Sequence, residues 1–281
     1  MMNVFERVAE LRARVAEWRG QGLRIGFVPT MGNLHDGHFA LVDLAREHAD
    51  RVVSSIFVNP TQFGPNEDYA LYPRTPDSDI TGLRQHGVDA LLLPSVEEMY
   101  PFGTANHVQM HVPGITDILC GRHRPGHFNG VATVVARLFN MVQPDVAVFG
   151  RKDYQQLQVV RYMTRDLAFP IRIIPAPTLR EPDGLAMSSR NRYLDSAQRT
   201  LAPTIHRALL AMRDARRRDD PPGRIEGVGE AILIEAGFVV DYVEVLRSDL
   251  SRPRESSETG LIAFIAARLG RTRLIDNLDL D

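Results

Sequence analysis

Apolar residues near the N-terminus recur at spacings of three and four, which is the repeat of one face of a helix. The positions are Val4, Val8, Leu11, Val15 and Trp18. They predict an N-terminal helix. The next apolar run, Ile25–Val28, is short and continuous, as in a buried strand, and we expect Pro29 to end it. A helical pattern then begins near Gly37, so the predicted order is strand, loop, helix.

The alternation of strand and helix continues to about residue 176. Short apolar runs predict further strands at 51–58, 89–93, 146–149 and 171–174. Longer periodic stretches predict helices at 128–142 and 153–167, and an earlier helix that Asp77 is expected to cap. Such alternation is typical of an α/β fold, in which a doubly wound parallel sheet carries helices on both faces.

The pattern changes after Pro177. A turn at Glu181–Gly184 and two helical stretches lead into runs at 238–246, 261–267 and 272–275 that read as strands without long helices between them. We therefore expect two domains: a larger α/β domain at 1–176 and a smaller C-terminal α+β domain at 177–281.

Composition narrows the class of protein. The chain has 281 residues, 44% of them hydrophobic, which is enough for two cores. Its 33 Lys and Arg residues are balanced by 35 Asp and Glu residues, so we expect no nucleic-acid partner. The single cysteine, Cys120, fits a reducing compartment, which predicts a cytoplasmic protein. The N-terminus has no apolar signal segment and no run is long enough for a membrane span, so we expect no membrane association.

The motif His35-Asp36-Gly37-His38 lies between the first predicted strand and the next helix, at the edge where doubly wound sheets bind ligands. Gly37 allows close approach of a backbone, the helix N-terminus attracts an anion, and two imidazoles can donate to phosphate oxygens. The motif therefore predicts a triphosphate site. Two other interpretations stay open: the histidines bind zinc, for which no obvious further ligand is nearby, or they only cap the helix.

Two further motifs carry groups that suit phosphate. Met187–Asn191 offers two hydroxyls and Arg190, whose guanidinium can make bidentate contacts, although a serine-rich turn that caps a helix has the same composition. Gly150–Asp153 directly follows the predicted strand at 146–149. There Lys152 can neutralise charge that develops on phosphorus, and Asp153 can bond ribose hydroxyls or cap its helix.

Neutral amides follow the same predicted strands. Asn59 and Gln62 come after the strand at 51–58, and Gln155 and Gln156 begin the helix at 153–167. They suit a substrate with hydroxyls and a carboxylate, although glutamine most often faces solvent. Arg124, in a glycine-rich loop, adds a cationic group.

Six segments in order between about residues 20 and 200 resemble the pantoate–β-alanine ligase (pantothenate synthetase) family. They are Pro29–His38, Ile56–Phe63, Tyr72–Arg74, Arg124–Phe128, Lys152–Leu157 and Met187–Asn191. Two later segments, Val240–Val245 and Arg273–Asn277, are similar to the smaller C-terminal domain of that family. This combination is far more specific than any single motif.

The resemblance implies an AMP-forming ligase of coenzyme A precursor biosynthesis with a Rossmann-like fold. In such an enzyme, pantoate attacks the α-phosphate of Mg-ATP to give pantoyl adenylate and pyrophosphate. The amine of β-alanine then displaces AMP and forms pantothenate. The resemblance also implies a homodimer, and we expect the smaller domain to close over the active site because an acyl adenylate must be kept from water.

The resemblance also assigns residues to these roles. The ATP site would be formed by Met31, Gly32, Asn33, Leu34, His35, Asp36, Gly37, His38, Gly150, Arg151, Lys152, Asp153, Leu179, Met187, Ser188, Ser189 and Arg190. His38 would be the main catalytic residue, with His35 and Lys152 also acting on the phosphates. The substrate-binding residues would be Gln62, Gln156, Asn59 and Arg124, and Asp79 would be a Mg²⁺ ligand.

Two positions depart from the family pattern. Arg151 stands where the family commonly has Glu, and Ser78 separates Asp77 from Asp79 where another acid is frequent, which weakens the metal assignment. Two rival functions remain. A nucleotidyltransferase that acts on a phosphate would not explain Gln62 together with Gln156, and a nucleotide-binding regulator without catalysis would not explain why the histidines and Lys152 are kept.

Overall fold

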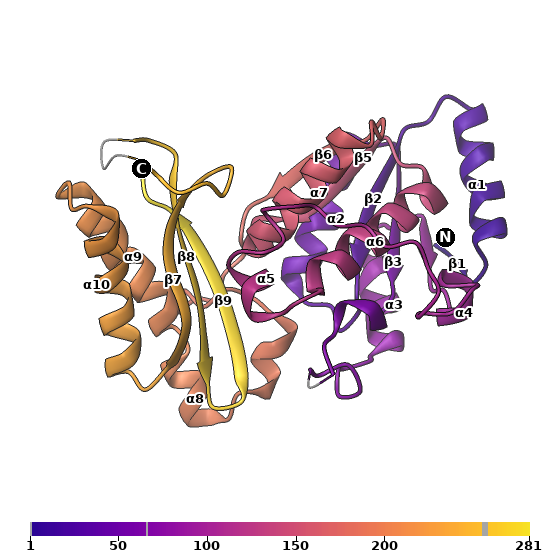
Figure 1. The fold of residues 1–281 in the computed structure, drawn as a ribbon. Coiled ribbons are helices and arrows are strands. Elements are labelled where there is room, and N and C mark those ends of the chain that lie inside the picture. Colours follow the sequence, from indigo (N-terminus) through magenta and orange to yellow (C-terminus); the bar gives the residue numbers. More distant parts are fainter. Residues whose placement is uncertain (1, 66, 255–257) are drawn as a thin grey trace. The chain divides into compact units, whose positions relative to one another are not determined.

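The computed structural model describes residues 2–65, 67–254 and 258–281 (Figure 1). Within these residues, one sheet has six parallel strands in the order β1-β4-β3-β2-β5-β6. Its strands are β1 (Asn3–Phe5), β2 (Ile25–Thr30), β3 (Arg51–Ile56), β4 (Ala90–Leu92), β5 (Val146–Gly150) and β6 (Arg172–Ala176). The order reverses next to β2, where a doubly wound sheet binds its ligands.

Helices cover both faces of this sheet. The helices in this part of the chain are α1 (Val8–Gly20), α2 (Asp36–His48), α3 (Pro76–Gln85), α4 (Val96–Met99), α5 (Cys120–His123), α6 (His127–Val142) and α7 (Tyr154–Asp166). Neighbouring residues of β2 point to opposite faces. Val28 packs in one cluster with Val42 of α2, whereas the Phe27 ring meets Phe139 of α6 with centroids 6.5 Å apart. The predicted α/β class with a doubly wound parallel sheet is therefore confirmed.

The N-terminal helix is shorter than its apolar spacing predicts. Val4 lies in β1, which pairs with β4, and α1 starts only at Val8. The helix buries Leu11, Val15 and Trp18. The prediction for Val4 was wrong because one apolar residue at helical spacing fits equally well in a short edge strand.

Two local predictions about proline and capping were also wrong. Pro29 does not end β2, because the strand continues to Thr30 with Pro29 paired to Ser55. The pairing of β2 with β5 covers only Gly26 and Phe27, so on that side Pro29 has no ladder bond to lose. Helix α3 has Thr75 as its N-cap residue and Pro76 in its first turn, which places Asp77 inside the helix.

The chain divides into two compact units. The first comprises the chain up to Arg151 together with Gln156–Pro177, and the second comprises Lys152–Gln155 and Thr178–Asp281. The second unit has helices α8 (Ser196–Leu201), α9 (Thr204–Arg217) and α10 (Pro222–Glu235), and strands β7 (Val239–Arg247), β8 (Leu261–Leu269) and β9 (Thr272–Asp279). Its strands form an antiparallel sheet in the order β7-β8-β9. The C-terminal region is therefore α+β, as predicted.

The second unit has a core of its own. Ile205, Leu209 and Met212 of α9 pack with Leu233 of α10 and Ile265 of β8 in one buried cluster. No helix in the part of the chain that the structure describes is both long and apolar enough to cross a membrane.

Candidate active site

The loop Met31–His38 follows β2 and is fixed by a buried carboxylate of α3. Asp79 accepts the main-chain N–H groups of Asn33 and Leu34, each at 2.8 Å, one with each carboxylate oxygen. The hydroxyl of Thr75 donates to the same carboxylate at 3.0 Å. Asp79 is only 2% exposed, so hydrogen bonds to the chain itself take up this carboxylate.

The same loop needs an unusual backbone. Gly32 and Asn33 both have positive φ angles, +83° and +50°. A Cβ atom at Gly32 would lie 3.0 Å from a methyl carbon of Ile56 and 3.2 Å from a carboxylate oxygen of Asp79. A side chain at this position would be strained by the backbone conformation and crowded by both neighbours, which favours glycine.

The two histidines cap the helix that follows. His35 is the N-cap residue of α2, and its Nδ1 accepts the N–H of Gly37 at 3.1 Å. The Nδ1 of His38 accepts the N–H of His35 at 3.3 Å, and the ring centroids lie 4.1 Å apart. Because both Nδ1 atoms accept, each neutral ring carries its proton on Nε2. The capping interpretation is therefore correct for the Nδ1 atoms of both rings.

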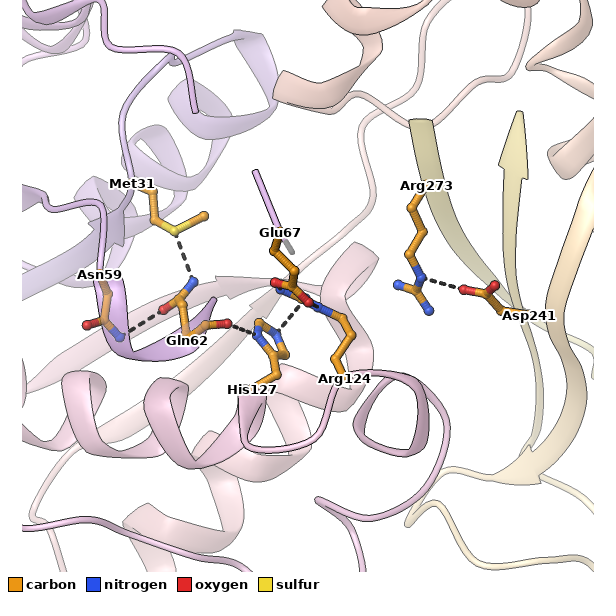
Figure 2. Close-up of polar contacts among 8 residues, drawn as sticks. All are labelled: Met31, Asn59, Gln62, Glu67, Arg124, His127, Asp241 and Arg273. Atoms are coloured by element: carbon orange, nitrogen blue, oxygen red, sulfur yellow. Dashed lines mark hydrogen bonds and ion pairs between the residues drawn. The ribbon is translucent and has the colours of Figure 1, made fainter. Parts of the chain in front are cut away.

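Asn59 and Gln62 form a buried amide pair beyond β3 (Figure 2). Asn59 is 1% exposed and donates through Nδ2 to Gln62 Oε1 and to the Gly130 carbonyl, both at 3.2 Å. The hydroxyl of Tyr100 donates to Asn59 Oδ1 at 2.8 Å. Gln62 is 8% exposed and its Nε2 lies 3.0 Å from the sulfur of Met31. The structure thus brings Met31, Asn59 and Gln62 together.

Arg124 and His127 connect the same segment to the start of α6 (Figure 2). Arg124 forms two hydrogen bonds to Glu67, from Nε at 2.7 Å and from Nη2 at 2.5 Å. Its Nη1 lies 3.0 Å from His127 Nε2, and His127 Nδ1 lies 2.8 Å from the Gln62 carbonyl. Burial alone would raise the pKa of Glu67, but the hydrogen bonds and charge of Arg124 outweigh it and hold that pKa below its usual value. In this structure Arg124 is bound to protein groups.

The motif Gly150–Asp153 begins at the carboxyl end of β5. This is the same edge of the sheet as the loop after β2, because the two strands are parallel neighbours. Lys152 is the only lysine in the chain. Its Nζ lies 3.6 Å from Asp153 Oδ1, and its main-chain carbonyl accepts Asn277 Nδ2 at 2.9 Å.

The last predicted substrate residue, Gln156, lies in α7 and is partly exposed, whereas its neighbour Gln155 is 6% exposed. By the division of the chain, Gln156 belongs to the first unit and Gln155 to the second. Because Gln156 is the more exposed of the two glutamines, it has the greater access to a ligand.

The segment from Leu179 to Arg190 lies in the second unit, where an ion pair fixes its first half. Arg180 donates to both carboxylate oxygens of Asp276 on β9, at 2.6 and 3.0 Å, and to the Gly184 carbonyl at 3.0 Å. The side chain of Asp276 is fully buried. Met187 N–H donates to the Leu179 carbonyl at 3.0 Å, which closes a hairpin before Ser188–Arg190.

The end of this segment is shaped by a local cap. Ser188 caps the short helix Ser189–Tyr193, and its hydroxyl accepts the N–H of Arg190 at 3.3 Å. Elsewhere in the second unit, Arg273 donates to Asp241 at 2.6 Å, as drawn in Figure 2.

Sequence reasoning missed several supporting residues. Glu67 and Tyr100 bond predicted site residues, yet no local motif marks them. Asp276 and Asn277 lie in the segment Arg273–Asn277, but its resemblance to the family did not reveal their contacts with Arg180 and Lys152. For Lys152, which was predicted, the sequence holds a further signal: it is the only lysine among the 33 Lys and Arg residues. Among residues 2–65, 67–254 and 258–281, no group of three or more His, Cys, Asp or Glu side chains is arranged to hold a metal ion.

The fold and this site define a class of protein. It is an α/β protein with a donor-rich helix N-terminus and buried amides at the carboxyl edge of its sheet, an arrangement that suits phosphate and carboxylate ligands. A family model described as Pantoate-beta-alanine ligase matches residues 3–279. The chain belongs to this family.

Relatives named pantothenate synthetase match nearly the whole chain. A pantothenate synthetase of Xanthomonas euvesicatoria pv. vesicatoria (strain 85-10) is 57% identical over 279 residues, which is 99% of this chain and 100% of the relative. One of Xylella fastidiosa (strain M12) is 58% identical over 280 residues, with the same coverage.

Solved structures agree with this membership. Pantothenate synthetase of Thermus thermophilus superposes with a TM-score of 0.93 at 48% identity and covers 99% of each chain. A pantoate-beta-alanine ligase of Francisella tularensis, complexed with beta-gamma ATP and beta-alanine, has a TM-score of 0.82 at 34% identity, covering 100% of this chain and 98% of its own.

Proposed function

We propose that the chain is an AMP-forming ligase that condenses (R)-pantoate with β-alanine to pantothenate at the expense of ATP. The observation that carries this proposal is the match of the family model over nearly the whole chain, together with a relative whose structure holds an ATP compound and β-alanine. The reaction has two steps, and the site supplies groups for each.

In the first step, a pantoate carboxylate oxygen attacks the α-phosphorus of ATP, and the bond between the α- and β-phosphates breaks. Pantoyl adenylate and pyrophosphate result. Negative charge grows on the phosphate oxygens, so the chain needs fixed donors rather than a base, because a carboxylate brings no proton to remove. His35 and His38, whose Nδ1 atoms are both occupied as caps, would direct Nε2–H at these oxygens. Lys152 would add a positive charge.

The rest of the proposed nucleotide site comes from the predicted motifs. Its backbone donors and side chains would be those of Met31, Gly32, Asn33, Leu34, Asp36, Gly37, Gly150, Arg151, Asp153, Leu179, Met187, Ser188, Ser189 and Arg190. The fixed backbone at Gly32 and Asn33 supports this role for the first of these segments, since a loop held in one conformation loses little entropy on binding.

In the second step, the β-alanine amine attacks the acyl carbon, the bond from that carbon to the AMP oxygen breaks, and the amine loses a proton to solvent. Gln62 and Gln156 would bind the pantoyl group through their amides. Asn59 is buried against Tyr100, Gly130 and Gln62, so we assign it the orientation of Gln62. Arg124 would contribute to substrate binding through Gln62, as argued in the next subsection.

Mg²⁺ would enter with the phosphates of ATP and neutralise part of their charge. Asp79 does not fit the role of its ligand, because both carboxylate oxygens accept main-chain N–H groups and the side chain is buried. We therefore assign Asp79 the positioning of the Met31–His38 loop.

Three further properties belong to the proposal. The smaller domain, residues 177–281, would close over the nucleotide and protect the adenylate from water. The enzyme would be a homodimer in the cytoplasm, as the family resemblance and the single cysteine suggest. It would bind neither nucleic acid nor membrane, in line with its balanced charge.

The proposal is tested by incubating the protein with Mg-ATP and pantoate, with and without β-alanine, and following pyrophosphate, AMP and pantothenate. AMP and pantothenate are expected in equal amounts and only with β-alanine. A product in which the nucleotide is joined to a phosphorylated acceptor would instead identify the rival nucleotidyltransferase.

Binding of ATP has an independent readout because Lys152 is the only lysine. Reductive methylation with ¹³C-formaldehyde keeps the charge and gives one lysine signal beside that of the N-terminal amine. The lysine signal is expected to shift and saturate with ATP. ATP binding without any turnover would instead favour the rival function, a nucleotide-binding regulator without catalysis.

A further inference from the structure

We propose that Glu67, Arg124 and His127 are positioning residues that hold Gln62 for the substrate. They form a continuous chain of hydrogen bonds from a carboxylate to the main-chain carbonyl of Gln62 (Figure 2). This inference rests on the proposed function only in taking Gln62 as a substrate-binding residue.

The direction of each hydrogen bond in the chain follows from the groups involved. A carbonyl oxygen can only accept, so His127 Nδ1 carries a proton and donates to Gln62 at 2.8 Å. The other ring nitrogen, Nε2, therefore accepts from Arg124 Nη1 at 3.0 Å, since a guanidinium can only donate. Arg124 uses its other nitrogens on Glu67. With these directions, each of these hydrogen bonds has one donor and one acceptor.

The contacts of Gln62 make its position depend on this chain. Its carbonyl is held by His127, its Oε1 by Asn59, and its Nε2 lies against Met31. Helix α6 also comes very close to this segment, because a Cβ atom at Gly130 would lie 2.4 Å from the Thr61 carbonyl oxygen. The segment Pro60–Gln62 thus packs against α6, and His127 bonds to its last residue, Gln62.

Arginine is the one side chain that can link both partners. Its fork reaches Glu67 through two nitrogens and His127 through a third, whereas a lysine ammonium is a single point charge. The side chain of Arg124 is 15% exposed and that of Glu67 is 23% exposed, so solvent screens this pair less than a surface pair. This use of the guanidinium explains Arg124 without direct contact to a substrate.

A purely structural role would affect stability without selecting one substrate. A positioning role for Gln62 predicts instead that the KM for pantoate changes while the KM for ATP does not. Asparagine offers a partial replacement for His127, because its amide nitrogen can take the place of Nδ1 and still donate to the Gln62 carbonyl. Alanine cannot do so.

The experiment compares H127A, H127N and R124K with the wild-type protein. The matched control is H111A. His111 is exposed, and its Nδ1 bonds to Asn129 of α6, the helix that also contains His127. H127A and R124K are expected to raise the KM for pantoate about tenfold, equivalent to one lost hydrogen bond. H127N should recover much of this loss, and the KM for ATP should stay within about twofold in all variants.

Hydrogen exchange of peptides that cover residues 59–65 provides a measurement without substrate. Exchange there is expected to be faster in H127A than in H111A, because the Pro60–Gln62 turn loses its attachment. If the wild-type protein makes no pantothenate but this exchange difference appears, the proposed function fails and the positioning of Gln62 stands.

Three results would overturn the inference. One is equal exchange in H127A and H111A. Another is a KM change in H127A that is the same for ATP as for pantoate. The third is H127N behaving no better than H127A, since the donor to Gln62 would then be irrelevant.

Discussion

The loops Met31–His38 and Leu179–Arg190 are both proposed to bind ATP, but the fold holds them differently. In the first, the carboxylate of Asp79 bonds the N–H groups of the loop itself. In the second, the buried pair of Arg180 and Asp276 fixes the beginning of a hairpin, and the serine motif lies beyond it.

The two loops are therefore anchored in different ways, and the two anchors should affect different properties of the protein. An anchor placed directly on a binding loop should affect nucleotide affinity when it is altered. An anchor at the base of a hairpin should chiefly affect the stability of its own unit. The first arrangement suits a preformed phosphate site, and the second suits a segment that adjusts when substrate binds.

The largest effect on stability is expected for D276N. The change leaves the Arg180 guanidinium, 19% exposed, without its buried counter-charge, which typically costs about 3–5 kcal/mol. Urea unfolding should show this loss. The control is D183N in the same hairpin, because the pair of Asp183 with Arg199 is 41% and 35% exposed and should cost below about 1 kcal/mol. Equal losses in both variants would refute the distinction.

Catalysis should depend most on His38, and its two roles can be separated. H38N keeps an oxygen that can accept the His35 N–H but removes Nε2–H, whereas H38A removes both groups. Both variants should lose about 100- to 1,000-fold in kcat. Only H38A should also lose helix-cap stability, of about 0.5–2 kcal/mol. Near-normal turnover by H38N would mean that His38 is only a cap.

Asp79 tests the anchored loop directly. D79N places an NH₂ group against main-chain donors, which should cost about 1–3 kcal/mol and raise the KM for ATP. D77N is the control, because Asp77 is an exposed residue of the same helix turn. If Asp79 were instead a metal ligand, excess Mg²⁺ would restore activity and stability would barely change.

The smallest effect is a pH dependence at Glu67, which concerns only the first unit. Arg124 lowers the pKa of Glu67 in the folded protein below the value of 4.5 expected when unfolded. The stabilisation is therefore fully present above that value and is lost as pH falls through the folded pKa. In acid unfolding, the stability of E67Q should therefore not fall over this pH range, whereas that of the wild-type protein should. Parallel curves for E67Q and the wild-type protein would contradict the shift.

The local features of the site were predictable from the sequence, and the distant ones were not. His35 and His38 are three residues apart in a strand–loop–helix pattern, so their place at the start of α2 follows from short-range rules. Asp79 bonds residues 45 and 46 positions away, and Arg124 bonds Glu67 at a separation of 57. No periodicity encodes such pairs, because they arise only when the sheet brings α3 and α6 to their places.

The same limit explains the errors at element boundaries. Val4 fits a helical repeat, and only pairing with β4 makes it part of a strand. Pro29 reads as a strand end, and only the short overlap of β2 with β5 allows it inside one.

The central claim is that the chain joins two substrates through an acyl adenylate. The most direct test uses pantoate with ¹⁸O in both carboxylate oxygens, together with Mg-ATP and β-alanine, and analyses AMP by mass spectrometry. If the carboxylate attacks the α-phosphorus and AMP leaves in the second step, each AMP carries one ¹⁸O and pantothenate retains the other. Unlabelled AMP, or ADP with labelled inorganic phosphate, would contradict the account.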